Sequence, residues 1–470
     1  MNTPIKDFLD KYNDESFTRL HMPGHKGAFF ADDITEIRGA DSLYEADGII
    51  RESERNASEI FGTRDTFYGT EGSSQMIKAM CFLACEYAKA KKKDCTPIIL
   101  ASRNAHKSFI HAAMLLQFEI VWIPSEDEYS LCSCYVSPEG LRDRISRVSK
   151  KLLMDSTRRQ GFNKYLAAVY VTSPDYLGNQ LNIEALSKVA HETGLLFLVD
   201  NAHGSYLKFM EEDKHPISLG ADICADSAHK TLPVLTGGAY LHISKDAPEG
   251  IEKNARTALL LFGSTSPSYL TLKSLDQANV LVKRDEYKYT EDTIRDFKFR
   301  AGQKGYSFTG EEPLKLTFDM RRENVNGYRF AELLREYKIE CDFADPDFVV
   351  TMWTPWNRAI EYDKLLDALE SIREQIGDGK PKSPYDEFHP HGAGRQIWAR
   401  LPEVRYQPWK MLYRSKKRVS VDYDICGSVA ADALVGCPPA VSPIVAGEVV
   451  DKNIVSILQY YGITEIDIVD

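Results

Sequence analysis

The sequence of 470 residues lacks the features that would direct a chain to a membrane or a secretory route. It contains no run of about 18 consecutive apolar residues, the length that a membrane-spanning helix needs. The N-terminal stretch MNTPIKDFLDKYNDESF mixes charges and has no apolar core, so it predicts neither a signal peptide nor a transit peptide. No internal repeat or low-complexity tract is visible either. We therefore expect no membrane contact.

Cysteine is sparse and shows no disulfide or metal-binding pattern. The nine cysteines are scattered, and several lie inside apolar runs such as Met80 to Cys85. Free thiols in a reducing compartment are the simplest explanation, so we expect a cytoplasmic protein. Cys132 and Cys134 form a close pair, but no matching Cys or His cluster accompanies them, and we expect no metal.

Positive charge is in deficit. The net charge is −11, from 58 basic and 69 acidic residues, which argues against nucleic acid as a main partner. The chain is longer than the size at which one hydrophobic core stops growing, so two or three domains are expected.

The sequence does contain a lysine between two apolar runs. Lys230 follows Asp226-Ser227-Ala228-His229, and a second apolar run begins at Ala239, so the stretch predicts strand, reactive turn, strand. Burying an ammonium is costly unless it is paired or neutralised, and a lysine neutralised in this way can form a Schiff base. The alternative is a lysine at an edge or in a loop, with its amine in water.

An upstream carboxylate favours the reactive lysine. Five apolar residues, 195–199, end in Asp200, where a parallel strand would deliver a side chain to the ligand-binding edge of an open α/β sheet. The interval from Asp200 to Lys230 has room for one crossover between neighbouring strands. Pyridoxal phosphate needs such a pair, with the aspartate on its pyridinium nitrogen and the lysine on its aldehyde.

A small-residue turn offers a place for the cofactor phosphate. Gly72-Ser73-Ser74 stands immediately before a helical pattern that runs from Met76 to Tyr87. A helix start with free amides and hydroxyls binds anions, although an ordinary serine N-cap would have the same sequence. Beside Lys230 and Asp200, we favour the phosphate.

Several motifs, in order, resemble those of the Orn/Lys/Arg decarboxylase family. They are LHMPGHKG at 20–27, Asp200-Asn201-Ala202-His203-Gly204, and Asp226 to Thr231. The resemblance covers nearly all of the chain and implies a pyridoxal-phosphate enzyme of fold type I, in a short form without an N-terminal receiver-like domain. The implied α/β fold has a mainly parallel central sheet with helices on both faces, and a smaller α+β C-terminal domain.

The resemblance also implies roles for individual residues. His106, in a motif similar to the family's R-N-x-H-K-S, would stack on the pyridine ring, and His229 or Lys230 would return a proton to the substrate Cα. Thr265 lies in a loop that resembles one reaching the phosphate of a neighbouring subunit, which implies at least a homodimer with shared active sites. Alternatively, Ser266 in that loop caps a helix before Pro267. The full cofactor-binding set is Gly72, Ser73, Ser74, His106, Asp200, Ala202, His203, Ser227, His229, Lys230 and Thr265.

Four segments are expected: an N-terminal arm at 1–60, a cofactor-binding large domain at 61–300, a small α/β segment at 301–376, and a C-terminal decarboxylase domain at 384–470. A linker is predicted from Gly377 to Pro381. Near the end, Ala440-Val441-Ser442 departs from the family's P-P-G-I-P, which leaves the path of that loop open. Asp422 and Asp424 are candidates for binding the substrate's far cationic end, and plain turn carboxylates are the alternative.

The expected activity is decarboxylation of arginine, lysine or ornithine to an amine that feeds polyamine synthesis. Cofactor motifs alone do not decide which bond at Cα breaks, so an aminotransferase or a carbon–carbon lyase is the alternative. A catalytically silent regulatory subunit is a third reading, and the joint presence of Lys230, Asp200 and His106 argues against it.

Overall fold

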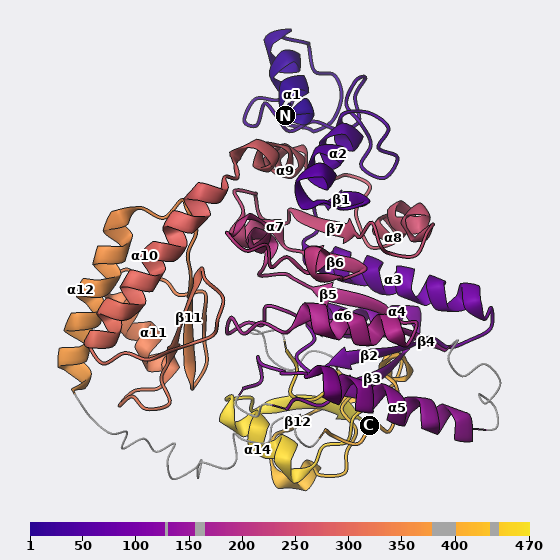
Figure 1. Cartoon of the computed structure of the whole chain (residues 1–470), viewed down its shortest axis with the longest axis vertical. Helices are drawn as coiled ribbons and strands as arrows, with labels where there is room; N and C mark the ends of the chain where they lie inside the picture. The colour runs from indigo at the N-terminus through magenta and orange to yellow at the C-terminus, as the bar shows by residue number, and fades with distance from the viewer. Residues whose placement is uncertain (127–129, 156–164, 378–400, 433–440) are drawn as a thin grey trace.

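The computed structural model describes residues 1–126, 130–155, 165–377, 401–432 and 441–470 (Figure 1). Most of the predicted linker, 378–381, and the first residue of the altered loop, Ala440, lie outside the described residues. No helix in the described ranges is long and apolar enough to cross a membrane.

A seven-stranded sheet forms the centre of the molecule, in the order β1-β7-β6-β5-β4-β2-β3. Only β7 runs against its neighbours, so the sheet is mainly parallel, as predicted. The strands are buried over nearly their whole length, which explains their continuous apolar runs. The strand bounds are β1 Asp65–Gly69, β2 Ile98–Ser102, β3 Glu119–Ile123, β4 Leu166–Thr172, β5 Leu196–Asp200, β6 Ile223–Asp226 and β7 Ala239–Ile243.

Strand β1 was not predicted: the sequence indicates strands near residues 97, 118, 167, 195, 221 and 237, and none near 65. Its five residues, DTFYG, have aromatic residues at the centre and an aspartate and a glycine at the ends, so no apolar run marks it. It is a strand because it pairs antiparallel with β7 across all five positions, from Asp65 opposite Ile243 to Gly69 opposite Ala239.

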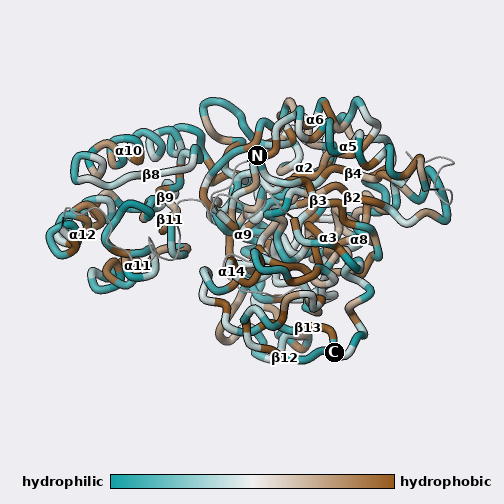
Figure 2. The backbone as a smooth tube through the Cα atoms, turned by 90° about the horizontal axis from the view of Figure 1, so that it is seen from below, coloured by the Kyte–Doolittle hydropathy of each residue, from teal (hydrophilic) through white to brown (hydrophobic). Residues whose placement is uncertain are grey.

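Helices cover both faces of the sheet. Figure 2 shows α5 and α6 on one side of the strands and α3 and α8 on the other, with the most hydrophobic backbone between them. The long helix α3 contacts β4, β5, β6 and β7 and is buried along most of its length. The bounds are α3 Ser73–Lys91, α4 Lys107–Leu116, α5 Pro138–Met154, α6 Ile183–Glu192, α7 Ala228–Thr231, α8 Ala255–Leu261 and α9 Tyr269–Leu281.

A smaller α/β unit lies beside the central sheet (Figure 1). Its antiparallel sheet has the order β10-β11-β9-β8, and two of its helices each bury an apolar face. The C-terminal part pairs β12 with β13 around a separate apolar cluster. The bounds are α10 Arg284–Gln303, β8 Phe308–Thr309, β9 Lys315–Asp319, α11 Gly327–Glu336, β10 Phe343–Ala344, β11 Phe348–Met352, α12 Ala359–Ile376, β12 Lys416–Ser420, α14 Lys452–Tyr460 and β13 Glu465–Val469.

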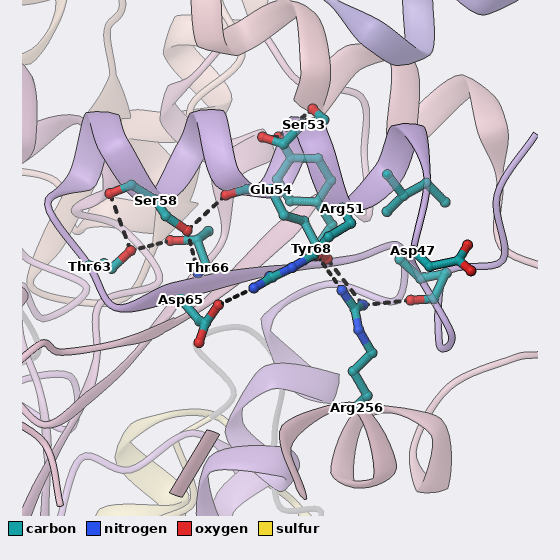
Figure 3. Close-up of polar contacts among 12 residues, drawn as sticks. Asp47, Arg51, Ser53, Glu54, Ser58, Thr63, Asp65, Thr66, Tyr68 and Arg256 are labelled. Carbon is teal, nitrogen blue, oxygen red and sulfur yellow. Dashed lines mark hydrogen bonds and ion pairs between the residues drawn. The ribbon is translucent and has the colours of Figure 1, made fainter. Parts of the chain in front are cut away.

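The N-terminal arm is fixed to the sheet by buried charges. Its helices are α1, Pro4–Asp14, and α2, Ile49–Phe61, and α2 contacts β1. Figure 3 shows Arg256 extending from α8 toward Glu54 of α2. Glu54 is fully buried and also accepts a hydrogen bond from the backbone N–H of Tyr68, at 3.0 Å. An ion pair between Arg51 and Asp65, at 2.5 Å, adds a second tie between α2 and β1.

Candidate active site

Lys230 lies where β6 turns back toward β7. The prediction of a turn between two strands is refined, because the lysine belongs to the one-turn helix α7. Its Nζ is 3.0 Å from Nε2 of His203, which follows the neighbouring strand β5. Burial lowers the pKa of Lys230, and the charge of Asp200 acts in the opposite direction. A larger fraction of the amine is therefore uncharged than for a lysine in water, as a nucleophile requires.

Asp200 is the last residue of β5 and is only 1% exposed. Its Oδ2 accepts a hydrogen bond from the hydroxyl of Tyr170, at 2.9 Å, and its Oδ1 accepts one from the backbone N–H of Ala202, at 3.3 Å. Burial raises the pKa of Asp200 to about 6, and the hydrogen bond from Tyr170 and the charge of Lys230 oppose that rise. A buried carboxylate with this little compensation is suited to a cationic partner.

The predicted anion site lies at the start of α3. The helix begins at Ser73, not after Ser74 as predicted, because Gly72 has a φ of +69° and turns the chain into the helix earlier. Ser73 and Ser74 therefore belong to the first helical turn, whose amides have no partner within the helix. A Cβ built on Gly72 would meet no atom within 4 Å, so this turn borders open space.

His106 is joined to the same turn by hydrogen bonds. It caps α4, and its Nδ1 accepts from the backbone N–H of Ser108, at 3.1 Å. The hydroxyl of Ser108 in turn donates to that of Ser74, at 2.8 Å. Burial lowers the pKa of His106 to about 3, with a smaller contribution from the charge of Lys230. The imidazole is therefore neutral at physiological pH, as a ring that stacks on a cationic pyridine should be.

Ser227 and His229 precede Lys230 and offer further polar atoms. The His229 Nδ1 lies 3.0 Å from the Gly238 carbonyl, to which it donates, so its Nε2 is left as an acceptor. Ser227 is 1% exposed, and among the described residues its hydroxyl has no hydrogen-bond partner. An orphaned buried hydroxyl and an open helix start fit a phosphate group, and Lys230 and Asp200 fit the aldehyde and ring nitrogen of pyridoxal phosphate.

Of the remaining predicted residues, Ala202 lies at the site, and Thr265, Asp422 and Asp424 are exposed. Thr265 is exposed between α8 and α9, and Ala202 is buried beside Asp200. The alternative in which Ser266 caps the next helix is wrong: the cap of α9 is Ser268, whose hydroxyl accepts from the backbone N–H of Thr271. Asp422 and Asp424 are both exposed, and Asp422 accepts from the backbone N–H of Asp424. Among the residues that the structure describes, no hydrogen bond or ion pair joins either carboxylate to Lys230.

Three charged residues of the small α/β unit were not predicted for this site. Lys315 and Glu312 form a buried ion pair at 2.8 Å, and Lys315 also donates to the carbonyl of Asp175, at 3.3 Å. The charges of Asp342, Lys315 and Glu312 all act on Lys230. No local pattern marks these residues, because they reach the site only when the small unit packs against the large one.

The C-terminal part is fixed to the site by a buried pair that was also not predicted. Arg103, just before His106, donates to Glu448 at 2.9 Å, and both side chains are nearly inaccessible. Arg103 also donates to the carbonyl of Pro443, and Val441 forms an isolated β-bridge with His106. Two residues of the altered loop, Val441 and Ser442, are thus buried beside His106.

A lysine after β6, a carboxylate at the end of β5 and a helix start suited to an anion fit a pyridoxal-phosphate enzyme of fold type I. Solved lysine decarboxylases share this fold. The enzyme LdcF of Francisella novicida superposes with a TM-score of 0.80 at 16% identity, over 100% of this chain and 81% of its own. Lysine decarboxylase A of Pseudomonas aeruginosa gives 0.81 at 16% identity, over 99% and 80%.

The chain belongs to the Orn/Lys/Arg decarboxylase family. The profile of that family's major domain matches residues 3–304. The uncharacterized protein YaaO of Bacillus subtilis is 28% identical, over 96% of this chain and 93% of its own. An arginine decarboxylase of the same organism is 26% identical, over 97% and 92%. The predicted family, fold class and cofactor are confirmed.

Proposed function

We propose that this protein decarboxylates a basic L-amino acid with pyridoxal phosphate as cofactor. The juxtaposition of Lys230 and Asp200 at the ends of β6 and β5 carries the proposal, together with a family whose characterised relatives are named as arginine and lysine decarboxylases. When bound, the cofactor holds the substrate's amine and accepts the electrons of the bond that breaks.

The chain's own residues would bind and orient the reactants. Lys230 would hold the cofactor aldehyde, Asp200 would stabilise the protonated ring nitrogen, and His106 would contact the ring. The first turn of α3, with Ser73 and Ser74, receives the phosphate, together with Ser227 and His229. Ser108 donates to both His106 and Ser74 and so links the histidine to the first turn of α3. A shift of either residue would therefore move the other.

Lys230 or His229 would return a proton to the substrate Cα after carbon dioxide leaves. The contact between Lys230 Nζ and His203 Nε2, at 3.0 Å, supports the lysine, because a neutral imidazole nitrogen that accepts a hydrogen bond from the amine orients it. Burial also lowers the pKa of His203, so this ring stays uncharged and leaves the proton on the lysine.

The carboxylates that would bind the substrate's far end can be told apart by mutation. Asp422 and Asp424 remain the sequence-based candidates, and Asp342 is a further one because its charge acts on Lys230. Asp424→Asn should raise KM for the preferred diamino acid more than it weakens cofactor loading. An unchanged KM for Asp424→Asn, with a raised KM for Asp342→Asn, would transfer the role to Asp342.

Assembly, location and pathway are further parts of the proposal. The exposed loop that carries Thr265 supports a homodimer in which each subunit reaches the other's phosphate. Eight cysteines in the described residues are all free, which supports a reducing cytoplasm. The amine product of arginine, lysine or ornithine would feed polyamine synthesis.

The decisive experiment measures carbon dioxide release from arginine, lysine, ornithine and a panel of other amino acids. Purified holoenzyme with a recorded cofactor absorbance band should release carbon dioxide from one basic amino acid. Lys230→Ala, which cannot hold the cofactor covalently, is the control. A cofactor band without release from any amino acid would reject decarboxylation, and a ketoacid or aldehyde product would indicate the aminotransferase or lyase instead.

A further inference from the structure

Tyr170 is a polar residue where the strand pattern calls for an aliphatic one. Strand β4 is buried along its length, and Tyr170 is completely inaccessible. Its ring packs on Phe109 of α4, with the centroids 4.3 Å apart. A buried phenol without a partner loses the hydrogen bonds that water would provide, so its hydroxyl needs a specific acceptor.

The sheet register places that acceptor beside the ring. Strands β4 and β5 pair in parallel with Tyr170 opposite Leu198 and Thr172 opposite Asp200. Because side chains alternate between faces, Tyr170 and Asp200 are diagonal neighbours on the same face. The hydroxyl donates to Asp200 Oδ2 at 2.9 Å, and the backbone N–H of Ala202 donates to Oδ1.

We propose that Tyr170 is a positioning residue that fixes the orientation of the Asp200 carboxylate and keeps it ionised opposite the cofactor's ring nitrogen. The inference rests on the proposed role of Asp200. The phenol donates to one carboxylate oxygen and the Ala202 amide donates to the other, so the carboxylate cannot rotate freely. Its remaining lone pairs point away from these two donors.

The Tyr170 hydroxyl acts only as a hydrogen-bond donor to Asp200. Burial and the adjacent carboxylate raise the pKa of Tyr170, so it stays protonated and always donates. A donor stabilises the ionised carboxylate more than the neutral acid. Without the donor, the proton shared between Asp200 and the ring nitrogen moves toward Asp200, and the ring becomes a weaker acceptor of electrons.

The test compares the holoenzyme of the parent with Tyr170→Phe, Asp200→Asn and Tyr68→Phe. The readout is the NMR signal of an isotope-labelled ring nitrogen, whose shift separates the protonated from the unprotonated ring. Tyr68 is a matched control, because it is equally buried and hydrogen-bonded, to Ser53 and Asn279, but has no contact with Asp200. We expect Asp200→Asn to shift the signal to the unprotonated position, Tyr170→Phe to shift it partway, and Tyr68→Phe to leave it unchanged.

Cofactor affinity supplies a second readout on the cofactor-free protein. Tyr170→Phe should weaken pyridoxal phosphate binding by roughly tenfold or more, since hydrogen bonds to charged groups are the stronger ones. Tyr170→Leu, which matches the aliphatic neighbours in the strand, replaces the phenylalanine variant if that one does not fold. If Asp200→Asn shifts the ring signal and neither Tyr170 variant does, the role of Tyr170 is rejected while that of Asp200 stands. If Asp200→Asn itself leaves the signal unchanged, the proposed role of Asp200 fails first.

Discussion

Two aspartates end neighbouring strands of the same sheet, and their surroundings have opposite effects. Asp200 ends β5 and Asp226 ends β6, and both are buried. Burial raises the pKa of Asp200 to about 6. Burial alone would do the same to Asp226, but the charges and hydrogen bonds of His215 and His242 lower its pKa well below the ordinary value. The two carboxylates therefore have equivalent positions in the sheet, and their neighbouring side chains determine whether the pKa is raised or lowered.

The partners of Asp226 form a closed network. His215 Nε2 lies 3.0 Å and His242 Nε2 3.4 Å from its Oδ2, and Asn201 donates to its Oδ1 at 2.8 Å. Cys224 also donates to Oδ1, at 3.3 Å. His215, Cys224 and Asp226 are close enough to ligate a metal ion, but hydrogen bonds already join them. A carboxylate compensated on all sides is structural, whereas Asp200, with one phenol and one amide, still needs a cation.

The largest expected effect is a loss of activity when Asp200 is replaced. Asp200→Asn should lower kcat/KM by roughly two to three orders of magnitude, because removing one partner of a buried ion pair costs about 3–5 kcal/mol. Steady-state carbon dioxide release measures it. Asp246→Asn, at an exposed aspartate after β7, serves as the control and should leave the rate unchanged. A loss of less than fivefold in Asp200→Asn would contradict the role.

Replacing Asp226 should lower stability instead of activity. Asp226→Asn leaves His215 and His242 without their buried anion, so the free energy of unfolding should drop by roughly 3 kcal/mol or more. Denaturant unfolding of the cofactor-free protein measures the loss. The pH dependence follows from the lowered pKa: the stabilisation is complete above the unfolded value near about 3.9 and is lost as pH falls below it. The parent should therefore lose stability in acid more steeply than the variant.

The sequence predicted those elements and site residues that a local pattern marks. The helical pattern of 49–61 predicts a helix and the apolar run 348–352 predicts a strand, and α2 and β11 have these bounds. The strand end at Asp200 and the lysine at 230 were equally visible. Tyr170, His215 and His242 were not assigned to the site, since their contacts join residues that only the folded sheet brings together. The Arg103–Glu448 pair, 345 residues apart, was missed for the same reason.

A smaller effect is a gain in stability: most mutations destabilise a protein, but Asp200→Asn should stabilise this one in its cofactor-free form. The pKa of Asp200 is raised above its unfolded value, so the folded cofactor-free protein binds a proton more tightly than the unfolded chain does between about pH 4 and 6. Stability should therefore decrease as pH rises through that window, and the penalty persists at neutral pH. Asp200→Asn removes it and should stabilise the cofactor-free protein by about 1–3 kcal/mol at pH 7.5.

Thermal unfolding at pH 7.5 and pH 4 tests this sign. The gain from Asp200→Asn should be present at pH 7.5 and nearly absent at pH 4, where the parent's carboxyl is already protonated. Asp226→Asn should show the opposite sign at pH 7.5, which gives the comparison an internal control. Equal and pH-independent destabilisation by both variants would mean that Asp200 is as fully compensated as Asp226.

The smallest effect concerns how many donors the Asp226 network can lose. Cys224 is one of three hydrogen-bond donors to Asp226, beside His215 and Asn201, and a thiol is a weak donor, so Cys224→Ala should lower the free energy of unfolding by only about 1 kcal/mol, mostly through lost packing. Denaturant unfolding compares it with Cys81→Ala, another fully buried cysteine, on α3. A loss in Cys224→Ala that clearly exceeds the loss in Cys81→Ala would mean that the thiol is needed to hold Asp226. Similar losses would mean that the hydrogen bonds from His215 and Asn201, with His242 nearby at 3.4 Å, suffice to hold the carboxylate.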